Sequence, residues 1–128
     1  MNRILIVEDD TNRRSWFDKK FAHCQRDATD DVSVAVQWLL EREYELIFLD
    51  HDLAEVHYQF ELADDGLTGY TVAAWLAEHP ERQAEAQIII HSLNYPGSQR
   101  MLQCLQNAGR AAEHVPFPYL PALFVNSI

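Results

Sequence analysis

The stretch that decides the fold runs from residue 47 to residue 53 and reads Ile-Phe-Leu-Asp-His-Asp-Leu. Three apolar residues lead directly into Asp50, His51 and Asp52. An uninterrupted apolar run of this kind is typical of a parallel strand that is buried on both faces. In α/β proteins the carboxyl ends of such strands form the edge of the sheet where ligands bind. The stretch therefore predicts a buried strand that ends at a functional surface.

Two further apolar runs end in polar residues in the same way. Residues 4–7 lead into an acidic triplet, and residues 88–90 lead into the sequence His-Ser-Leu-Asn. If the three runs are neighbouring parallel strands, their polar ends meet at one edge of the sheet. The residues that this arrangement brings together are Glu8, Asp9, Asp50, His51, Asp52, His91, Ser92 and Asn94.

Apolar residues recur with helical spacing between these runs. Helices are expected at about residues 33–42, 68–78 and 99–108, and Thr11 or Asn12 is the expected cap of a first helix. Ser98 is the expected cap of the last helix, which Gly109 is expected to close in a left-handed conformation. The expected secondary structure comprises these segments: 3–7, 33–42, 47–49, 68–78, 88–90 and 99–108.

The weakest elements are the second and fifth strands. Residues 26–31 are too polar for a good strand, so the second strand is expected to be very short or unrecognisable. A short fifth strand is expected at 114–117, and the proline-rich tail does not predict a full last helix. The stretch 54–67 has no clear periodicity, which is typical of a lid or a binding loop. The alternation of strands and helices predicts an α/β fold with a three-layer, doubly wound parallel sheet, formed by one domain over residues 1–128.

Length and composition agree with one domain that has a sizeable core. The chain has 128 residues, of which 48% are hydrophobic, and a formal net charge of −10. This charge repels nucleic-acid phosphate over most of the surface, which argues against a general DNA- or RNA-coating role. It leaves open the local binding of one phosphate through a metal ion and an arginine.

Cysteine usage and hydropathy bear on the compartment. Cys24 and Cys104 lie in helix-like segments without CxxC spacing, which is typical of core cysteines in a cytosolic protein. The first residues lead directly into the strand at 3–7 without a leader, and no apolar run approaches the roughly 18 residues that a membrane span needs. We therefore expect a cytoplasmic protein without membrane contact.

The acidic residues predict a site for Mg²⁺ or Mn²⁺. Hard divalent cations bind carboxylate and carbonyl oxygens, and they bind where one or two carboxylates leave positions open for water and phosphate. Glu8, Asp9 and Asp50 can supply such oxygens from neighbouring strand ends. Carboxylates crowded together are costly without a counter-charge, so a cation or a carboxyl group with a raised pKa must be part of the site.

Two histidines, His51 and His91, flank the acidic cluster. A histidine at a strand end can be purely structural, but one with a carboxylate neighbour suits general acid–base catalysis near neutral pH. Asn94 and Arg100 suit the holding of phosphoryl oxygens, with Ser92 in support. We therefore expect a site that acts on a phosphate ester.

The sequence Ile-Leu-Ile-Val-Glu-Asp-Asp at 4–10, followed by Leu-Asp-His-Asp-Leu at 49–53, resembles the receiver domain of two-component response regulators over about residues 1–118. The resemblance implies a receiver, or flavodoxin-like, fold in which Asp50 accepts a phosphoryl group from a histidine kinase. The metal ligands that it implies are Glu8, Asp9, Asp50 and the main-chain carbonyl of Asp52.

Two features differ from ordinary receivers. Their fifth strand ends in a lysine before a proline, and the corresponding residue here is expected to be Phe117, before Pro118. Ordinary receivers also lack a histidine directly after the phosphoacceptor and the His-Ser-Leu-Asn sequence at 91–94. These departures, together with the Arg-Met pair at 100–101, resemble the cyclic-phosphate processing receiver domain. That resemblance implies a metal-assisted hydrolase for a cyclic phosphate, either an RNA 2′,3′-cyclic end or a cyclic nucleotide.

The leading hypothesis is a metal-dependent phosphoesterase in which His51 and His91 exchange protons with the attacking water and the leaving oxygen, next to Asp50. The first alternative is a stand-alone receiver that is phosphorylated on Asp50. The second is a degenerate receiver that only binds a ligand or a partner. The expected partner is a phosphate-containing small molecule or an RNA end; a second copy or a protein partner is expected, if at all, at the helix 99–108 and the C-terminal face.

Overall fold

Five parallel strands form one sheet in the computed structural model, which describes residues 2–53 and 68–125. The strands are β1 (Arg3–Val7), β2 (Gln25–Thr29), β3 (Leu46–Leu49), β4 (Gln87–Ile90) and β5 (Ala112–His114). Their spatial order is β2-β1-β3-β4-β5, and every neighbouring pair is parallel. The strand order reverses between β1 and β3, and ligands of doubly wound sheets bind outside the strand ends at such a point.

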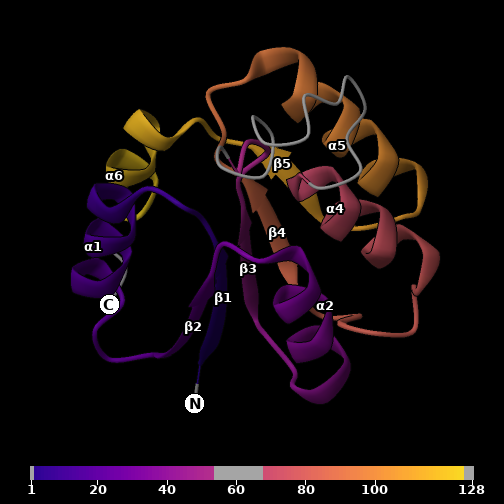
Figure 1. Ribbon diagram of the computed structural model, residues 1–128, viewed down its shortest axis with the longest axis horizontal. Helices are drawn as coiled ribbons and strands as arrows, with labels where there is room; N and C mark the ends of the chain where they lie inside the picture. Colours follow the sequence, from indigo (N-terminus) through magenta and orange to yellow (C-terminus); the bar gives the residue numbers. More distant parts are fainter. Residues whose placement is uncertain (1, 54–67, 126–128) are drawn as a thin grey trace.

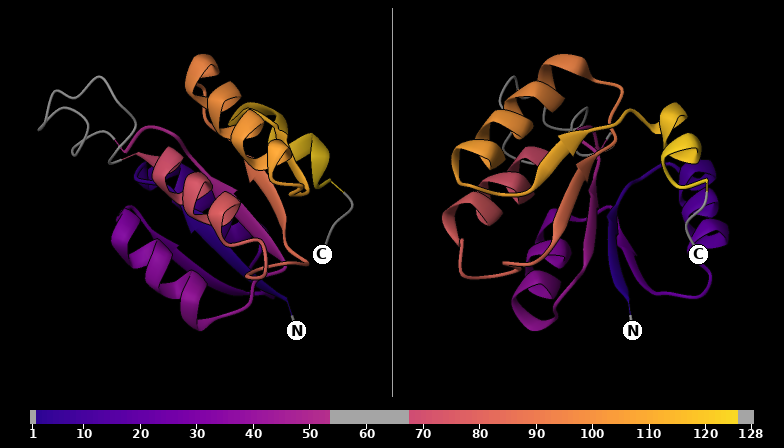
Figure 2. Two further views of the ribbon diagram at one scale, coloured as in Figure 1. Left: turned by 90° about the vertical axis from the view of Figure 1, so that its right-hand side faces the viewer. Right: turned by 180° about the vertical axis from the view of Figure 1, so that it is seen from behind.

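Helices cover both faces of the sheet, as Figures 1 and 2 show. The helical segments are α1 (Thr11–Lys20), α2 (Val32–Glu41), α4 (Gly69–Glu78), α5 (Tyr95–Asn107), the 3₁₀ turn η1 (Phe117–Tyr119) and α6 (Leu120–Leu123). Helices α1 and α6 lie on one face, whereas α2, α4 and α5 lie on the other. The three layers confirm the predicted doubly wound architecture.

The core consists of two clusters, one on each face of the sheet. Alternate residues of the central strands enter each cluster, so that Leu5 and Ile47 pack towards α2, α4 and α5 while Ile6 and Phe48 pack towards α1 and α6. Because β1, β3 and β4 are covered on both faces, their sequences are apolar without alternation. This explains why these three strands could be recognised from sequence.

The second strand is longer than its composition predicted. β2 spans Gln25–Thr29 and pairs in full register with β1, where Arg3 is opposite Gln25 and Val7 is opposite Thr29. It is the edge strand of the sheet, and its first two side chains are exposed. Polar side chains are compatible with such a position because main-chain hydrogen bonds to a single neighbour define the strand. Of the two predicted alternatives, a very short second strand was therefore wrong, whereas a strand that its polar composition does not reveal is present.

Two helix starts also differ from the prediction. Asp10, rather than Thr11 or Asn12, caps α1, and its side chain accepts a hydrogen bond from the N–H of Arg13. Asn94, rather than Ser98, caps α5, so this helix begins four residues earlier than expected, at Tyr95. Both capping residues lie close to the strand ends, so β1 and β4 pass almost directly into helices at the edge where the site was predicted.

The ends of the chain's other elements are largely as expected. Helix α4 begins after its cap Thr68, and Gly109 has a φ of 81° beyond the end of α5. β5 covers Ala112–His114, so it begins and ends earlier than the strand that was predicted at 114–117. The stretch 54–67, predicted to be a lid or a binding loop, lies outside the described residues. No helix in the ranges 2–53 and 68–125 has the length and apolar character that crossing a membrane requires.

Candidate functional site

Three side chains that follow strand ends meet beneath the top edge of the sheet. Glu8, Asp50 and His91 are the first residues after β1, β3 and β4, and they offer ligand atoms within 4.8 Å of one another. All three are buried. The N–H groups of Asp50 and His91 extend the parallel ladder, each donating at 3.0 Å to the last residue of the neighbouring strand. The predicted convergence of strand ends is therefore present.

Hydrogen bonds to both of its oxygens hold the carboxylate of Glu8. Oε1 accepts from Nε2 of His91 at 2.7 Å and from Nε of Arg13 at 3.1 Å. Oε2 accepts from the main-chain N–H of Asp10 at 2.9 Å. A buried carboxylate with several donors is held in its ionised form. Glu8 is thus a fixed negative charge.

Arg13 is the positive charge of the site. It lies in the first turn of α1, and its guanidinium extends back over the ends of β1 and β3, where one terminal nitrogen is 3.7 Å from Oδ2 of Asp50. The guanidinium carbon also lies 5.9 Å from the ring centroid of Phe117. Arg13 was not among the residues predicted from sequence; the available signal was a basic residue in the first turn of a helix that starts directly after the acidic strand end.

The region around Asp50 depends on close main-chain packing. Oδ1 of Asp50 accepts from the N–H of His51 at 2.9 Å. A Cβ on Gly69, at the start of α4, would lie 1.7 Å from the main-chain oxygen of Asp50. The N–H of Gly69 donates to the carbonyl of His51 at 2.8 Å. Glycine is therefore required at this position so that α4 can approach the strand end.

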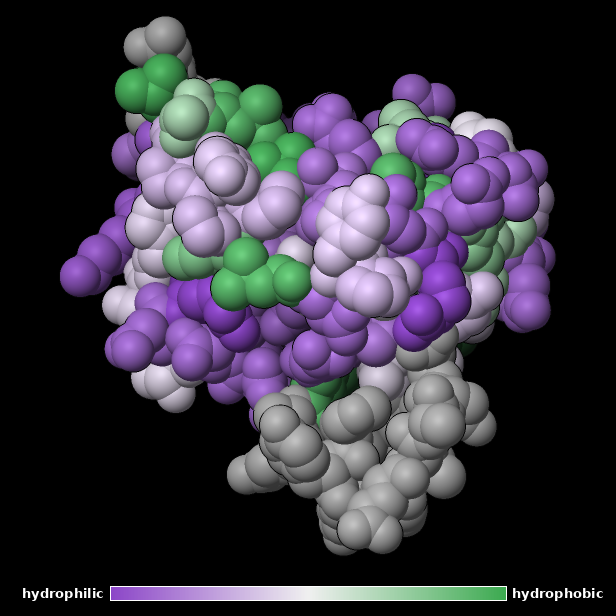
Figure 3. Space-filling view, turned by 90° about the horizontal axis from the view of Figure 1, so that it is seen from above, coloured by the Kyte–Doolittle hydropathy of each residue, from purple (hydrophilic) through white to green (hydrophobic). Residues whose placement is uncertain are grey.

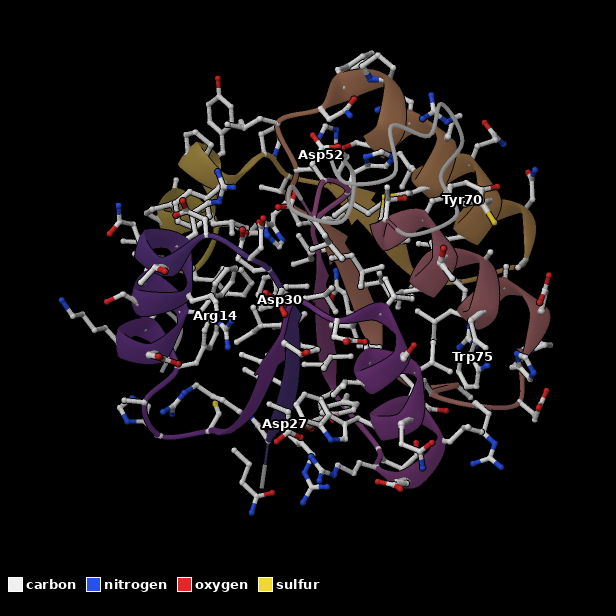
Figure 4. All side chains as sticks on the ribbon, in the orientation of Figure 1. Arg14, Asp27, Asp30, Asp52, Tyr70 and Trp75 are labelled. Carbon is white, nitrogen blue, oxygen red and sulfur yellow. The ribbon has the colours of Figure 1, made fainter. Side chains whose placement is uncertain are left out.

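A second polar network adjoins the acidic group. Nδ1 of His51 lies 2.7 Å from Oδ1 of Asp52, and the side-chain amide of Asn94 donates to the same oxygen at 3.1 Å. Oδ1 of Asn94 accepts from the N–H of Gly97 at 2.9 Å, which fixes the orientation of the amide. Figure 4 labels Asp52 at the top of the sheet, near the start of α5. Asn94 therefore caps α5 and orients the Asp52–His51 pair.

Glycine also allows the ring of His51 to pack against α5. A Cβ on Gly97 would lie 2.6 Å from Cδ2 and 2.8 Å from Nε2 of His51. The imidazole is buried and lies against the first turn of the helix. If Nδ1 carries the proton and donates it to Asp52, the lone pair is on Nε2. This is the arrangement of a histidine that a carboxylate orients for proton transfer.

His91 has a different environment. Its ring is surrounded by the aromatic side chains of Phe17, Phe48 and Phe117, with centroid distances of 5.3, 6.3 and 6.4 Å. Nδ1 is buried and has no hydrogen-bond partner in the described part of the chain. Burial lowers the pKa of His91, against the effect of Glu8. The neutral ring that donates from Nε2 to Glu8 fits these surroundings.

The two buried carboxyl groups have opposite pKa shifts. Burial and then the charge of Glu8 raise the pKa of Asp50 to about 8, although Arg13 opposes this shift. Burial would also raise the pKa of Glu8, but the hydrogen bond from His91 and the charge of Arg13 help to lower it to about 2. Without a metal, the site is therefore short of positive charge, as the sequence analysis anticipated.

The remaining predicted residues lie at or near this edge. Oγ of Ser92 accepts from the N–H of Asn94 at 3.0 Å, and the Ser92 hydroxyl opposes the rise in the pKa of Asp50. Asp9 is half-buried after β1 but is not part of the group of potential ligand atoms, and Arg100 is exposed on α5. Seen from above in Figure 3, this edge is mostly hydrophilic, with separate hydrophobic patches.

The position of the receiver lysine differs from the prediction. β5 ends at His114, and the N–H of Val115 continues the ladder to the carbonyl of Ile90 at 2.9 Å. The residue before the proline at this strand end is therefore Val115, and not Phe117. Val115 packs into the apolar cluster on the α1 side. The departure from ordinary receivers remains, with an aliphatic side chain where they have a cation.

The donor set fits a divalent cation. Two carboxylates and an imidazole within 4.8 Å of one another, with one arginine beside them, are ligand types that divalent metals bind. The raised pKa of Asp50 shows that a further positive charge would be stabilising. Glu8 and Asp50 are the residues that would hold such an ion.

The fold and this edge of the sheet define a receiver domain. A family model described as the cyclic-phosphate processing receiver domain matches residues 3–107. The chain belongs to this family. No curated protein matches the chain.

Solved structures of response regulators share the fold. TrrA from Thermotoga maritima, in complex with Mg²⁺ and BeF, has a TM-score of 0.67 and 18% identity, and the match covers 100% of both chains. The Mn²⁺-bound form of response regulator Rcp1 has a TM-score of 0.69 and 12% identity, with 100% of this chain and 97% of that chain covered. DrrB from Thermotoga maritima has a TM-score of 0.64 and 18% identity; 98% of this chain is covered, but it spans only about half (49%) of DrrB.

Proposed function

We propose that the chain is a metal-dependent phosphoesterase that hydrolyses a cyclic phosphate. The observation that carries the proposal is that the Asp52–His51 pair directly follows Asp50 in the chain, where Oδ1 of Asp50 accepts from the main-chain N–H of His51 and the carboxyl group lies in the buried group with Glu8. An oriented imidazole next to a site for a divalent ion is a combination that phosphate-ester hydrolysis uses. The family's description points to a cyclic phosphate as the substrate.

Glu8 and Asp50 would hold Mg²⁺ or Mn²⁺, with Asp9 and the main-chain carbonyl of Asp52 as the further ligands that the receiver resemblance implies. A bound ion would neutralise phosphate oxygens and lower the pKa of bound water. The fixed charge of Glu8 and the high pKa of Asp50 mean that the ion would replace the proton of Asp50.

His51 is the proposed proton carrier. With Nδ1 held by Asp52, Nε2 accepts a proton from the water that attacks phosphorus. One ester P–O bond of the ring breaks, and the proton is delivered to the leaving oxygen, so that the product is a phosphate monoester with a free hydroxyl group. Asn94 keeps the pair oriented, because it holds Asp52 and is itself held by α5.

His91 has a positioning role in this proposal instead of the proton transfer that the sequence suggested. Its Nε2 is bonded to Glu8, and its ring lies among phenylalanines, where a charged imidazole would be unfavourable. Ser92 opposes the rise in the pKa of Asp50. Arg100 remains a proposed contact for non-bridging phosphate oxygens, from its exposed position on α5.

The test is product release from RNA oligonucleotides with 2′,3′-cyclic phosphate ends and from cyclic mono- and dinucleotides, each with Mg²⁺, Mn²⁺ or a chelator. Turnover is expected only with metal, and Asp50→Asn is expected to abolish it. Asp27→Asn is a matched control, because Asp27 lies on the edge strand, where its carboxylate accepts a hydrogen bond from the hydroxyl of Tyr44. Metal-independent turnover, or full turnover in Asp50→Asn, would contradict the proposal.

A signalling receiver is the second candidate, and the fold together with the position of Asp50 after β3 favours it. This candidate predicts labelling of Asp50 by acetyl phosphate and no turnover of any cyclic phosphate. Val115 argues against this candidate. It stands where ordinary receivers have a lysine, so a phosphoryl group on Asp50 would lack the cation that pairs with it there. Labelling with no turnover would favour this candidate over the hydrolase.

A further inference from the structure

Arg13 contacts both carboxylates of the proposed metal site but holds them unequally. Its Nε is hydrogen-bonded to Glu8 at 3.1 Å, whereas its terminal nitrogen is 3.7 Å from Asp50, beyond hydrogen-bonding distance. The carboxylate of Asp50 accepts its main-chain hydrogen bond on the other oxygen, Oδ1. The oxygen that faces Arg13 is therefore the one that a stronger cation could take.

The side chain of Arg13 can leave this position. Its exposed fraction is 30%, against 0% for Glu8 and 5% for Asp50. Its main chain is fixed, because the N–H is bonded to the capping side chain of Asp10 at 2.9 Å. The guanidinium can thus rotate outwards on a fixed helix while the carboxylates stay in place.

A divalent ion at Asp50 would repel the guanidinium. A cation bound to Oδ2 lies about 2.0–2.6 Å from that oxygen. The guanidinium nitrogen is 3.7 Å from the same oxygen, so two positive charges would be brought close together in a largely buried site. Movement of the arginine away from Oδ2 would relieve this repulsion.

We infer that Arg13 is a displaceable counter-ion, which pairs with Glu8 beside Asp50 in the metal-free protein and moves to the phosphate of the substrate when a divalent ion binds the two carboxyl groups. The inference rests on the metal site of the proposed function. A guanidinium released at the rim stays beside the ion, where a phosphate bound to that ion presents its oxygens. Arginine binds such oxygens through two parallel hydrogen bonds.

Arg13 thereby supplies a cation on the phosphate side of a site whose fifth strand is followed by Val115. The guanidinium also lies 5.9 Å from the ring centroid of Phe117, three residues after the end of that strand. This aromatic side chain offers a surface along which the guanidinium can rotate outwards.

Calorimetric titration of the intact chain with Mn²⁺ alone tests the first half of the inference. Arg13→Gln is expected to bind Mn²⁺ on the order of tenfold more tightly than the wild type, because a competing positive charge has been removed. Arg14→Gln is the matched control: Arg14, labelled in Figure 4, is the neighbouring residue and donates to the main-chain oxygen of Ala28 at 3.4 Å, so the Mn²⁺ affinity of this variant is expected to stay within about twofold of the wild type. Arg13→Lys keeps a competing charge and is expected to stay near the wild type.

Titration of the Mn²⁺-loaded proteins with inorganic phosphate tests the second half. Arg13→Gln is expected to bind phosphate about tenfold more weakly than the wild type or Arg14→Gln, since a charge-assisted pair of hydrogen bonds is lost. Unchanged phosphate affinity would overturn the transfer to phosphate. Equal or weaker Mn²⁺ affinity in Arg13→Gln, with normal binding by the wild type, would overturn the displacement and leave the metal site standing. No Mn²⁺ binding by any variant would overturn both the inference and the metal site.

Discussion

Nε2 of His91 lies 2.7 Å from Oε1 of Glu8, and both side chains are buried at the ends of β4 and β1, on either side of β3. On the opposite side of the ring, Nδ1 has no partner within the described residues. A protonated Nδ1 would bury an unpaired N–H among phenylalanine rings, whereas a bare Nδ1 leaves an unpaired acceptor, which proteins tolerate better. The pair therefore fixes Glu8 with a neutral histidine.

Replacement of His91 by phenylalanine is expected to weaken Mn²⁺ binding about 10–100-fold, the usual effect of removing a residue that orients a metal ligand. The ring shape is kept, so the aromatic surroundings of Phe17 and Phe48 stay filled. Calorimetric titration with Mn²⁺ measures the change. Wild-type Mn²⁺ affinity combined with lost turnover would instead assign His91 to proton transfer.

His51→Gln is expected to lower turnover and leave Mn²⁺ affinity nearly unchanged, in contrast to His91→Phe. The proposed proton carrier is lost, so turnover should fall about 10²–10⁴-fold, while Mn²⁺ affinity stays within about threefold. A rise in KM alone would contradict this prediction, because it would show a role in binding. The comparison with His91→Phe separates the two histidines by metal affinity and by kcat.

Asp50→Asn is expected to stabilise the metal-free protein at alkaline pH. The pKa of Asp50 is raised to about 8, so the folded state holds a proton that the unfolded chain releases near its usual, lower pKa. The stability from this proton is fully present below the usual pKa of 3.8, falls as the pH rises above that value, and is gone once the pH has passed the folded-state pKa of about 8. Asparagine needs no proton, and the gain at high pH should be about 1–4 kcal/mol, as for the removal of a poorly compensated buried charge.

Thermal unfolding in a chelator between about pH 7 and pH 9 measures this effect. In that range neither Glu8, with a pKa of about 2, nor His91, with a pKa below its ordinary value, changes its charge in the folded state. The wild type should lose stability across the range and the variant should lose less. Added Mn²⁺ should restore the wild type but not Asp50→Asn. Equal slopes in the chelator would show that Asp50 is ionised throughout.

The central part of the site could be predicted because it follows from strand order. The apolar runs before Glu8, Asp50 and His91 are visible in the sequence, and parallel strands place their ends together. Arg13 could not be selected in the same way. Its relevance depends on the start of α1, which is set by Asp10, and on the direction of a long side chain.

Burial and capping account for the other differences. The sequence grouped His51 with His91, but only the packing shows that one bonds Asp52 and the other faces phenylalanines. Asn94 was predicted to hold phosphate, yet its oxygen is used by the first turn of α5. Competition between a cap and a ligand contact is decided by local geometry, which residue type does not reveal.

Arg110 is expected to matter for stability and not for the site. Its buried guanidinium donates to the carbonyl oxygens of Leu76, His79, Arg82 and Gln83. Arg110→Met leaves these acceptors unpaired and should cost about 3–5 kcal/mol in the free energy of unfolding. Chemical denaturation measures the loss, with Arg82→Met as the control because its own bond to Leu40 is exposed. The folded Arg110→Met variant should keep the Mn²⁺ affinity of the wild type.

Gly97→Ala is expected to lower turnover without a comparable loss of stability. The added Cβ would lie 2.6 Å from the ring of His51, so the imidazole must shift away from its position at Asp52. Within α5, alanine is favoured over glycine by up to about 1 kcal/mol, which offsets part of the packing cost. Gly109→Ala is the converse control: its Cβ has no atom within 4 Å, but φ is 81°, so stability should fall while kcat is kept. Measured kcat and midpoints of denaturation for the two variants test the contrast, and a normal kcat in Gly97→Ala would show that the position of His51 against α5 does not control the reaction.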